Sequence, residues 1–149
     1  MTSTRHAAWV LLAACVISPA ANATLGGDIA SVAQDRTLAK AALRAQPSRL
    51  YTVFESQNES GTLIREYAGV DGKIFAVAWS GPLMPDLRQL LGPYFPQYIA
   101  NSGERKSGHS SRNARHGDLV VHSGGRMRAF SGKAYLESAI PKGVEIDGL

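Results

Sequence analysis

The chain has 149 residues, a formal net charge of +4 and 44% hydrophobic residues. A single cysteine excludes an internal disulfide and a cysteine-based metal site. The mild positive charge favours solubility and does not by itself predict nucleic-acid binding.

The first twenty-three residues have the pattern of a secretory signal peptide. Arg5 supplies a positive start, residues 7–17 form an apolar run of eleven, and Ala21-Asn22-Ala23 supplies the small residues that signal peptidase accepts. We expect export to the periplasm or beyond, with a mature chain of 126 residues starting at Thr24. The apolar run is shorter than the roughly 20 residues that span a bilayer, so we expect no transmembrane segment after processing.

Cys15 leaves an alternative open. Leu12-Ala13-Ala14-Cys15 resembles a lipobox, which would make the protein lipid-anchored through this cysteine. The segment before it is short for a lipoprotein signal, and the Ala-Asn-Ala site lies at a suitable distance after the apolar run. The sequence therefore favours cleavage before Thr24.

The first element of the mature chain is a predicted helix. Leu25-Gly26-Gly27 predicts a flexible lead-in, and Asp28 is a good N-cap residue. Residues 29–45 are rich in Ala, Leu, Lys and Arg, with apolar positions near helical spacing. Pro47 ends this N-terminal helix.

Alternating apolar residues predict three strands, at residues 50–56, 62–68 and 74–79. Asp71-Gly72 predicts a type I′ hairpin between the second and third strands. This turn would set Ala68 opposite Phe75, with Phe75, Val77 and Trp79 on the core face.

A central helix follows, with Pro85 at its first position and Gly92 at its end. Residues 101–117 are polar and basic, which predicts a mobile loop. Two more strands are predicted at 118–123 and 127–130, with Gly124-Gly125 as their turn, and residues 133–140 predict a short helix.

These elements predict a single α+β domain over residues 24–149, carrying the mobile basic loop at 101–117. We expect an antiparallel sheet of about five strands, with the N-terminal helix and the central helix packed on one face.

No catalytic, cofactor or metal site is predicted. His109, His116 and His122 are too widely spaced for a zinc site without partner cysteines, and no nucleophile motif is present. Glu66 falls on the core face and needs a partner, for which Arg88 is a candidate.

Two groups of residues are candidates for partner binding. The aromatic residues after the third strand could pack in the core or form a docking groove, and the basic loop could contact anionic envelope polymers or lipid head groups. The candidates are Trp79, Tyr94, Phe95, Tyr98, Arg105, Lys106, Arg112 and Arg115.

Three sets of residues together resemble a known family. The first runs from Tyr51-Thr52-Val53 through Asp71-Gly72 to the stretch 75–82, the second is 85–92, and the third runs from 117–121 to Phe130-Ser131-Gly132. They resemble the exported proteobacterial family called domain of unknown function 2844. The resemblance implies an exported single-domain protein and carries no activity or site residues with it.

The function predicted is that of an exported envelope protein, a non-enzymatic binding or accessory module without a cofactor. Its partner would be an envelope protein, a peptide or an anionic polymer, and not nucleic acid. The alternative is an enzyme of hydrolase type, with a site around Glu66 and Arg88. A cleft with convergent polar groups would favour the enzyme, and a flat apolar patch would favour binding.

Overall fold

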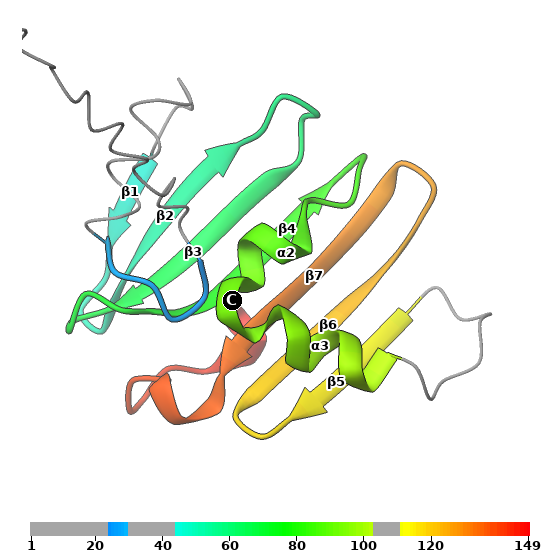
Figure 1. Ribbon diagram of the computed structural model, residues 1–149. Helices are drawn as coiled ribbons and strands as arrows, with labels where there is room; N and C mark the ends of the chain where they lie inside the picture. The colour runs from blue at the N-terminus through cyan, green and yellow to red at the C-terminus, as the bar shows by residue number, and fades with distance from the viewer. Residues whose placement is uncertain (1–23, 30–43, 103–110) are drawn as a thin grey trace, which may run out of the picture.

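The computed structural model describes residues 24–29, 44–102 and 111–149. Its main feature is an antiparallel sheet of seven strands in the order β1-β2-β3-β4-β7-β6-β5 (Figure 1). The strands are β1 (Arg44–Pro47), β2 (Tyr51–Gln57), β3 (Leu63–Gly69), β4 (Ile74–Gly81), β5 (Ser111–His116), β6 (Leu119–Arg126) and β7 (Ala129–Leu136). Every neighbouring pair is antiparallel, so short connections suffice for most of the sheet.

Each of the five predicted strands overlaps a strand of the sheet, although the fifth spans 129–136 and not 127–130. The two strands that were not predicted are the edges of the sheet. β1 has the sequence RAQP and β5 the sequence SRNARH. Neither has the apolar alternation that marks a half-buried strand, and Pro47 suits an edge because it cannot donate to a ladder. Charged and proline-containing edges also resist pairing with other chains.

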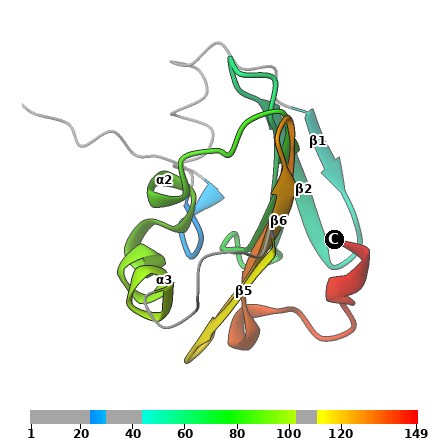
Figure 2. The same cartoon turned by 90° about the vertical axis from the view of Figure 1, so that its right-hand side faces the viewer.

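One face of the sheet is covered by the helices α2 (Leu87–Leu91) and α3 (Phe95–Ser102), joined by the 3₁₀ turn η1 (Gly92–Tyr94) (Figure 2). The side chain of Asp86 accepts hydrogen bonds from the amides of Arg88 and Gln89, so Asp86 is the N-cap. Pro85 therefore precedes the helix instead of opening it. Gly92, at φ 49°, ends α2 as the sequence predicts.

The helices and the sheet enclose the larger of two cores. Leu91, Ile74, Val77 and Val121 are fully buried within it. Leu25 is also fully buried there, and its amide donates to the carbonyl of Leu90 at 2.9 Å. The prediction of a flexible lead-in is wrong for this residue, because one buried leucine and its backbone bonds hold the segment against α2 and β4.

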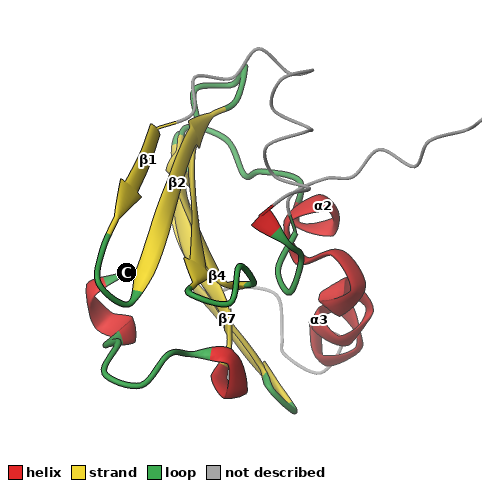
Figure 3. Cartoon of the chain, turned by 90° about the vertical axis from the view of Figure 1, so that its left-hand side faces the viewer, coloured by secondary structure: helices red, strands yellow, loops and turns green. Residues whose placement is uncertain are grey.

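The opposite face carries a smaller core beneath the C-terminal segment (Figure 3). After β7, the chain forms the short 3₁₀ turns η2 (Glu137–Ala139) and η3 (Ile146–Gly148). The predicted helix at 133–140 is wrong, because its first half continues β7. Buried Tyr67, Phe75 and Ala76 contact apolar side chains of the tail, namely Ile140, Val144 and Leu149.

The hairpin between β3 and β4 differs from the predicted type I′ turn. The amide of Gly72 donates to the carbonyl of Gly69 at 3.0 Å, and Gly72 has φ 78° while Asp71 does not have a positive φ. This is a three-residue loop with a left-handed glycine. Ala68 consequently pairs with Ile74, and a bulge at Phe75 restores the predicted pairing of Glu66 with Val77. Phe75 therefore points away from the helices.

We expect Gly72→Val to lower the free energy of unfolding by at least about 1 kcal/mol, because a β-branched residue resists a positive φ. Gly72→Asn is the matched control, since asparagine adopts this conformation more readily. Chemical denaturation of both variants tests the turn. Equal stabilities would contradict the left-handed geometry at this position.

The buried phenol of Tyr67 makes the stability of the fold depend on pH in the alkaline range. Burial is the largest cause that raises the pKa of its phenol, the Arg65 guanidinium opposes the shift, and Tyr51 adds to it. In the unfolded chain the phenol ionises at about pH 10, whereas the folded protein keeps the proton to higher pH. Stability therefore falls as pH rises above about 10. We expect the free energy of unfolding to fall less in Tyr67→Phe than in the unmodified protein between about pH 8 and about pH 10.5. An equal fall in the two proteins would contradict the prediction.

The predicted fold class is wrong in two respects. The sheet has seven strands, not five. The structure describes no N-terminal helix: residues 30–43 of the predicted helix lie outside the described part, and its end at Arg44 and Ala45 belongs to β1. The predicted loop at 101–117 is also wrong at its ends, because α3 extends to Ser102 and Ser111–His116 forms β5. Residues 103–110 lie outside the described part.

Candidate functional site

A groove of about 440 Å³ lies on the sheet face opposite the helices. It is bordered by β3, β4, β7, β6 and β5, which lie side by side in that order. Its lining consists mainly of small or polar residues, together with the C-terminal Leu149. The side chains that determine its chemistry are Arg65, Ser80, Asn113, His122, Ser131 and Lys133.

The register of the sheet explains why these side chains meet. Arg65 pairs with Ala78, Ala78 with Lys133, and Lys133 with His122. His122 in turn pairs with Asn113. Directly paired residues of antiparallel strands point to the same face, so these five form one continuous row across the groove.

Small residues in the neighbouring positions make the face hollow. In the next row, Ser80 pairs with Ser131 and Ser131 with Gly124. None of the three has a side chain longer than a hydroxymethyl group, whereas Arg65 and Lys133 beside them are long. The groove is therefore a strip of small residues bordered by cationic side chains.

The two permanent cations of the groove have partners that leave part of each group available. The Nε of Arg65 donates to Glu55 at 2.9 Å, and its two Nη atoms form no hydrogen bond with the described residues. Lys133 donates to the backbone carbonyl of Ile146 at 2.6 Å and lies 3.9 Å from the fully exposed carboxylate of Asp147. An ammonium group has three donors, so Lys133 retains donors for a further acceptor.

His122 is oriented by its neighbours. Its Nδ1 lies 3.0 Å from Oδ1 of Asn113, which is an acceptor, so Nδ1 carries the hydrogen in the neutral ring. The imidazole also stacks on Tyr135. Nε2 makes no hydrogen bond within the described residues and remains available as an acceptor. No bond joins His122 to a serine of the groove in that part of the chain.

The four aromatic residues predicted to bind a partner lie on the face of the sheet that the helices cover, and not among the polar side chains of the groove. Trp79 and Tyr98 are buried in the larger core, and Tyr94 and Phe95 pack partly buried against it. Trp79 is nevertheless among the residues that line the groove, and its ring lies close to Gly132 of β7. Their predicted role in binding a partner stays a prediction.

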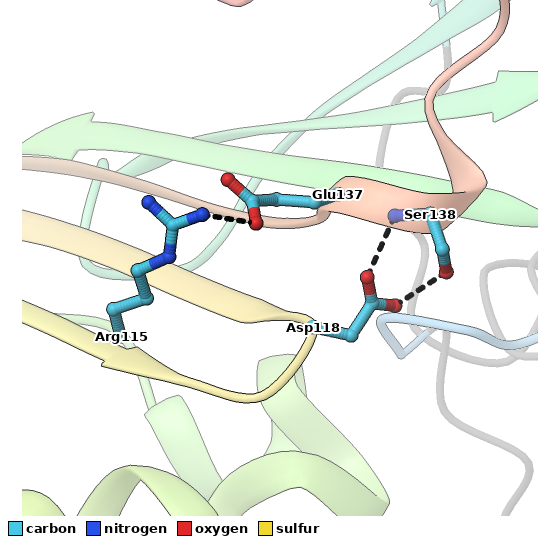
Figure 4. A network of polar contacts seen from close by, with 4 residues as sticks. All are labelled: Arg115, Asp118, Glu137 and Ser138. Carbon is cyan, nitrogen blue, oxygen red and sulfur yellow. Dashed lines mark hydrogen bonds and ion pairs between the residues drawn. The ribbon is translucent and has the colours of Figure 1, made fainter.

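The predicted basic residues are divided by the structure. Arg105 and Lys106 lie outside the described residues, and Arg112 lies on β5. Arg115 forms an ion pair with Glu137 at 2.5 Å, beside Asp118, whose carboxylate accepts two hydrogen bonds from Ser138 (Figure 4). This network joins the β5–β6 turn to the end of β7. Arg115 therefore has a structural contact, and its predicted binding role stays a prediction.

The residues considered for an enzyme site do not converge. Glu66 is 1% exposed beneath the helices, whereas Arg88 is exposed with its guanidinium 4.7 Å from the centre of the Phe95 ring. His116 is exposed at the end of β5 and His109 lies outside the described residues. In the described ranges, no group of three or more His, Cys, Asp or Glu side chains is placed to hold a metal ion.

A family model described as "Protein of unknown function (DUF2844)" matches residues 21–149. The chain belongs to this family. The resemblance noted in the sequence is thereby confirmed at the level of the family, whose description assigns no activity to the DUF2844 domain. No curated protein and no solved structure matches the chain. Within the described residues, no helix combines the length and the hydropathy needed to cross a membrane.

The sequence does not predict the groove, because the small residues that form it resemble turn residues. Gly124-Gly125 and Ser131-Gly132 were interpreted as turns, but both pairs lie inside strands. The actual turn is Met127-Arg128, where Arg128 has φ 65°.

Proposed function

We propose that the protein is a non-enzymatic binding module that holds a ligand in the groove of the sheet. The observation that carries the proposal is the row of Arg65, Lys133 and His122 beside a strip of serine and glycine. Binding sites in proteins are typically hollows of about 300–1,000 Å³ with a few oriented polar groups. The groove, at about 440 Å³, falls in this range.

The fixed orientation of the polar side chains supports a ligand-binding role for the groove over a purely structural one. Asn113 holds the His122 ring, and the carbonyl of Ile146 holds the Lys133 ammonium. Side chains fixed in this way lose less entropy when a ligand arrives. Both cations have carboxylate partners, Glu55 and Asp147, but neither of these carboxylates is among the described residues that line the groove.

The test is to fill the groove and measure binding. Ser131→Tyr adds a large side chain inside the groove on an exposed strand position, and tyrosine is well tolerated in strands. Ala129→Tyr makes the same addition on the same strand outside the groove. Amide shifts in NMR spectra are followed with a panel of anionic, neutral and cationic small molecules.

We expect at least one ligand to shift amides of β4, β6 and β7 saturably. Ser131→Tyr should weaken its affinity by roughly tenfold or more, as expected when a site is blocked, and Ala129→Tyr should leave it unchanged. Absence of binding across the whole panel, or binding that ignores Ser131→Tyr, would overturn the proposal.

We further propose that the protein is exported and works outside the cytoplasm. The signal-peptide pattern of residues 1–23 supports this proposal. The burial of Leu25 is consistent with a domain that starts near Thr24, because the second residue of the mature chain would then be part of the core.

The intact mass of the exported protein should correspond to 126 residues starting at Thr24. Replacing Ala23 with a large residue should retain the signal, because signal peptidase requires small residues at the cleavage site. A diacylglyceryl group on Cys15 would contradict this cleavage and support the lipid-anchored alternative.

A further inference from the structure

We propose that the groove binds the oxyanion of a small soluble ligand, a carboxylate or a phosphate, above Ala78 and between Arg65 and Lys133. The inference rests on the proposed function, because it names the class of ligand that the groove would hold. It follows from three observations: the sign of the lining charges, the donors they leave available, and the position of the small residue between them.

The charged side chains among the described residues that line the groove are both cationic, and Leu149, the last residue of the chain, lines the groove with them. Arg65 and Lys133 both line it, whereas their carboxylate partners, Glu55 and Asp147, do not. Glu55 lies one strand further out than Arg65 in the same row, and Asp147 is fully exposed on the C-terminal segment. The groove is therefore a cationic depression with its counter-charges on the rim, which attracts anions.

Arg65 and Lys133 also retain hydrogen-bond donors that a ligand could use. Glu55 accepts from Nε of Arg65, and the two Nη groups remain for an oxyanion, which guanidinium binds in a bidentate manner. Lys133 donates one hydrogen to Ile146, a neutral carbonyl that a charged oxygen can replace or join. Hydrogen bonds between charged groups are stronger than this neutral contact.

Ala78 provides the space in which the two cations can meet. It is the residue directly between Arg65 and Lys133 in the row, so their backbones lie two strand spacings apart, about 10 Å. Both side chains are long enough to lean over its methyl group from opposite sides. An oxyanion above Ala78 can therefore contact both, with the Ser80 hydroxyl in the next row.

The lining distinguishes a small anion from other ligands. Besides Trp79, whose ring lies against Gly132 on the other side of the sheet, no Phe, Tyr or Trp of the described part of the chain lines the groove. Sugars and bases are commonly bound by stacking on aromatic rings, so neither is the class favoured here. The volume of about 440 Å³ also suits a small molecule better than an extended polymer.

The experiment titrates the full exported chain with four probes: succinate, inorganic pyrophosphate, neutral glycerol and cationic putrescine. Amide shifts of Ala78, His122 and Lys133 report on the groove. Lys133→Gln and Arg65→Gln each remove one cation, and Lys142→Gln and Arg49→Gln remove the same charges at exposed positions away from it. Arg65→Lys retains the charge, and melting curves establish that each variant is folded.

We expect succinate or pyrophosphate to bind, and glycerol and putrescine not to. Each groove variant should weaken the affinity by roughly tenfold, the size of a lost charge-assisted hydrogen bond, whereas the two controls should change it less than about twofold. Arg65→Lys should bind more tightly than Arg65→Gln. Raising the ionic strength should weaken binding, because exposed charges are screened over about 8 Å at 0.15 M salt.

Different failures separate this inference from the proposed function. If glycerol or putrescine occupies the groove and neither anion does, the anion proposal is overturned and the binding module stands. If none of the probes and no member of the wider panel shifts the groove, both fall. Binding only to vesicles of anionic lipid, or anion binding that is equal in Lys133→Gln and Lys142→Gln, also overturns the small-anion site.

Discussion

Replacing Gly132 with alanine is expected to lower the free energy of unfolding by about 3 kcal/mol, the upper part of the range for overpacking a core. A methyl group at this position would lie 2.3 Å from Cζ2 of Trp79 and 2.6 Å from the backbone oxygen of His122. Gly132 lies in β7, which is paired on both sides. The backbone oxygen cannot move without disturbing the β6–β7 ladder, so the strain cannot be relieved by a side-chain rotation alone.

Gly148→Ala is the matched control, because a methyl group there meets no atom within 4 Å. It should change stability by less than about 0.5 kcal/mol. A double variant tests the cause. Trp79→Leu removes the ring that the new methyl would strike, so Gly132→Ala should cost at least about 1 kcal/mol less in that background. Additive effects in the double variant would show that the ring is not what Gly132 accommodates.

This glycine illustrates which parts of the fold can be predicted from the sequence. The strands with apolar alternation were predicted, because burial on one face leaves a period of two in the sequence. Gly132 was assigned to a turn, because local composition cannot distinguish a glycine that makes a turn from one that accommodates a ring from the neighbouring strand. The ring of Trp79 lies 53 residues earlier, and only the register brings the two together.

The edges of the sheet and the groove were missed for related reasons. β5 is polar because it is the edge strand of the sheet formed by the described residues and borders a polar groove, so its sequence resembles a loop. The row from Arg65 to His122 is assembled from β3, β4, β7 and β6. No spacing along the chain predicts such a row until the strand order is known. The chain forms β5 and β6 after leaving β4 and only then returns with β7 to the position beside β4.

The bulge at Phe75 moves this side chain from the core under the helices to the smaller core under the C-terminal segment. Substituting alanine for Phe75, which is 1% exposed, is expected to cost about 3–5 kcal/mol, the usual range for a buried phenylalanine. Its ring lies 6.1 Å from that of Tyr51 and 6.3 Å from that of Tyr67, centre to centre. Such aromatic pairs add to the effect of burial. Val70→Ala in the adjacent turn, where the side chain is 85% exposed, should be nearly neutral.

The region that Phe75→Ala destabilises first shows on which face of the sheet the Phe75 ring lies. In the predicted type I′ hairpin, Phe75 would lie under α2 and α3, and its loss would loosen the helices. In the structure it lies under the C-terminal segment with Val144 and Leu149. Amide hydrogen exchange should therefore accelerate first in residues 141–149, including the amide of Val144 that donates to Pro141.

Phe75→Leu keeps the experiment informative if the alanine variant does not fold, because it removes less volume and should cost less than about 1.5 kcal/mol. Its hydrogen exchange should show the same order, with the C-terminal segment affected before α2. Faster exchange confined to Leu87–Leu91 would place the ring on the helix face and contradict the bulge. Faster exchange confined to the tail would support it, and would identify Phe75 as the residue that ties this segment to the side of the sheet bearing the groove.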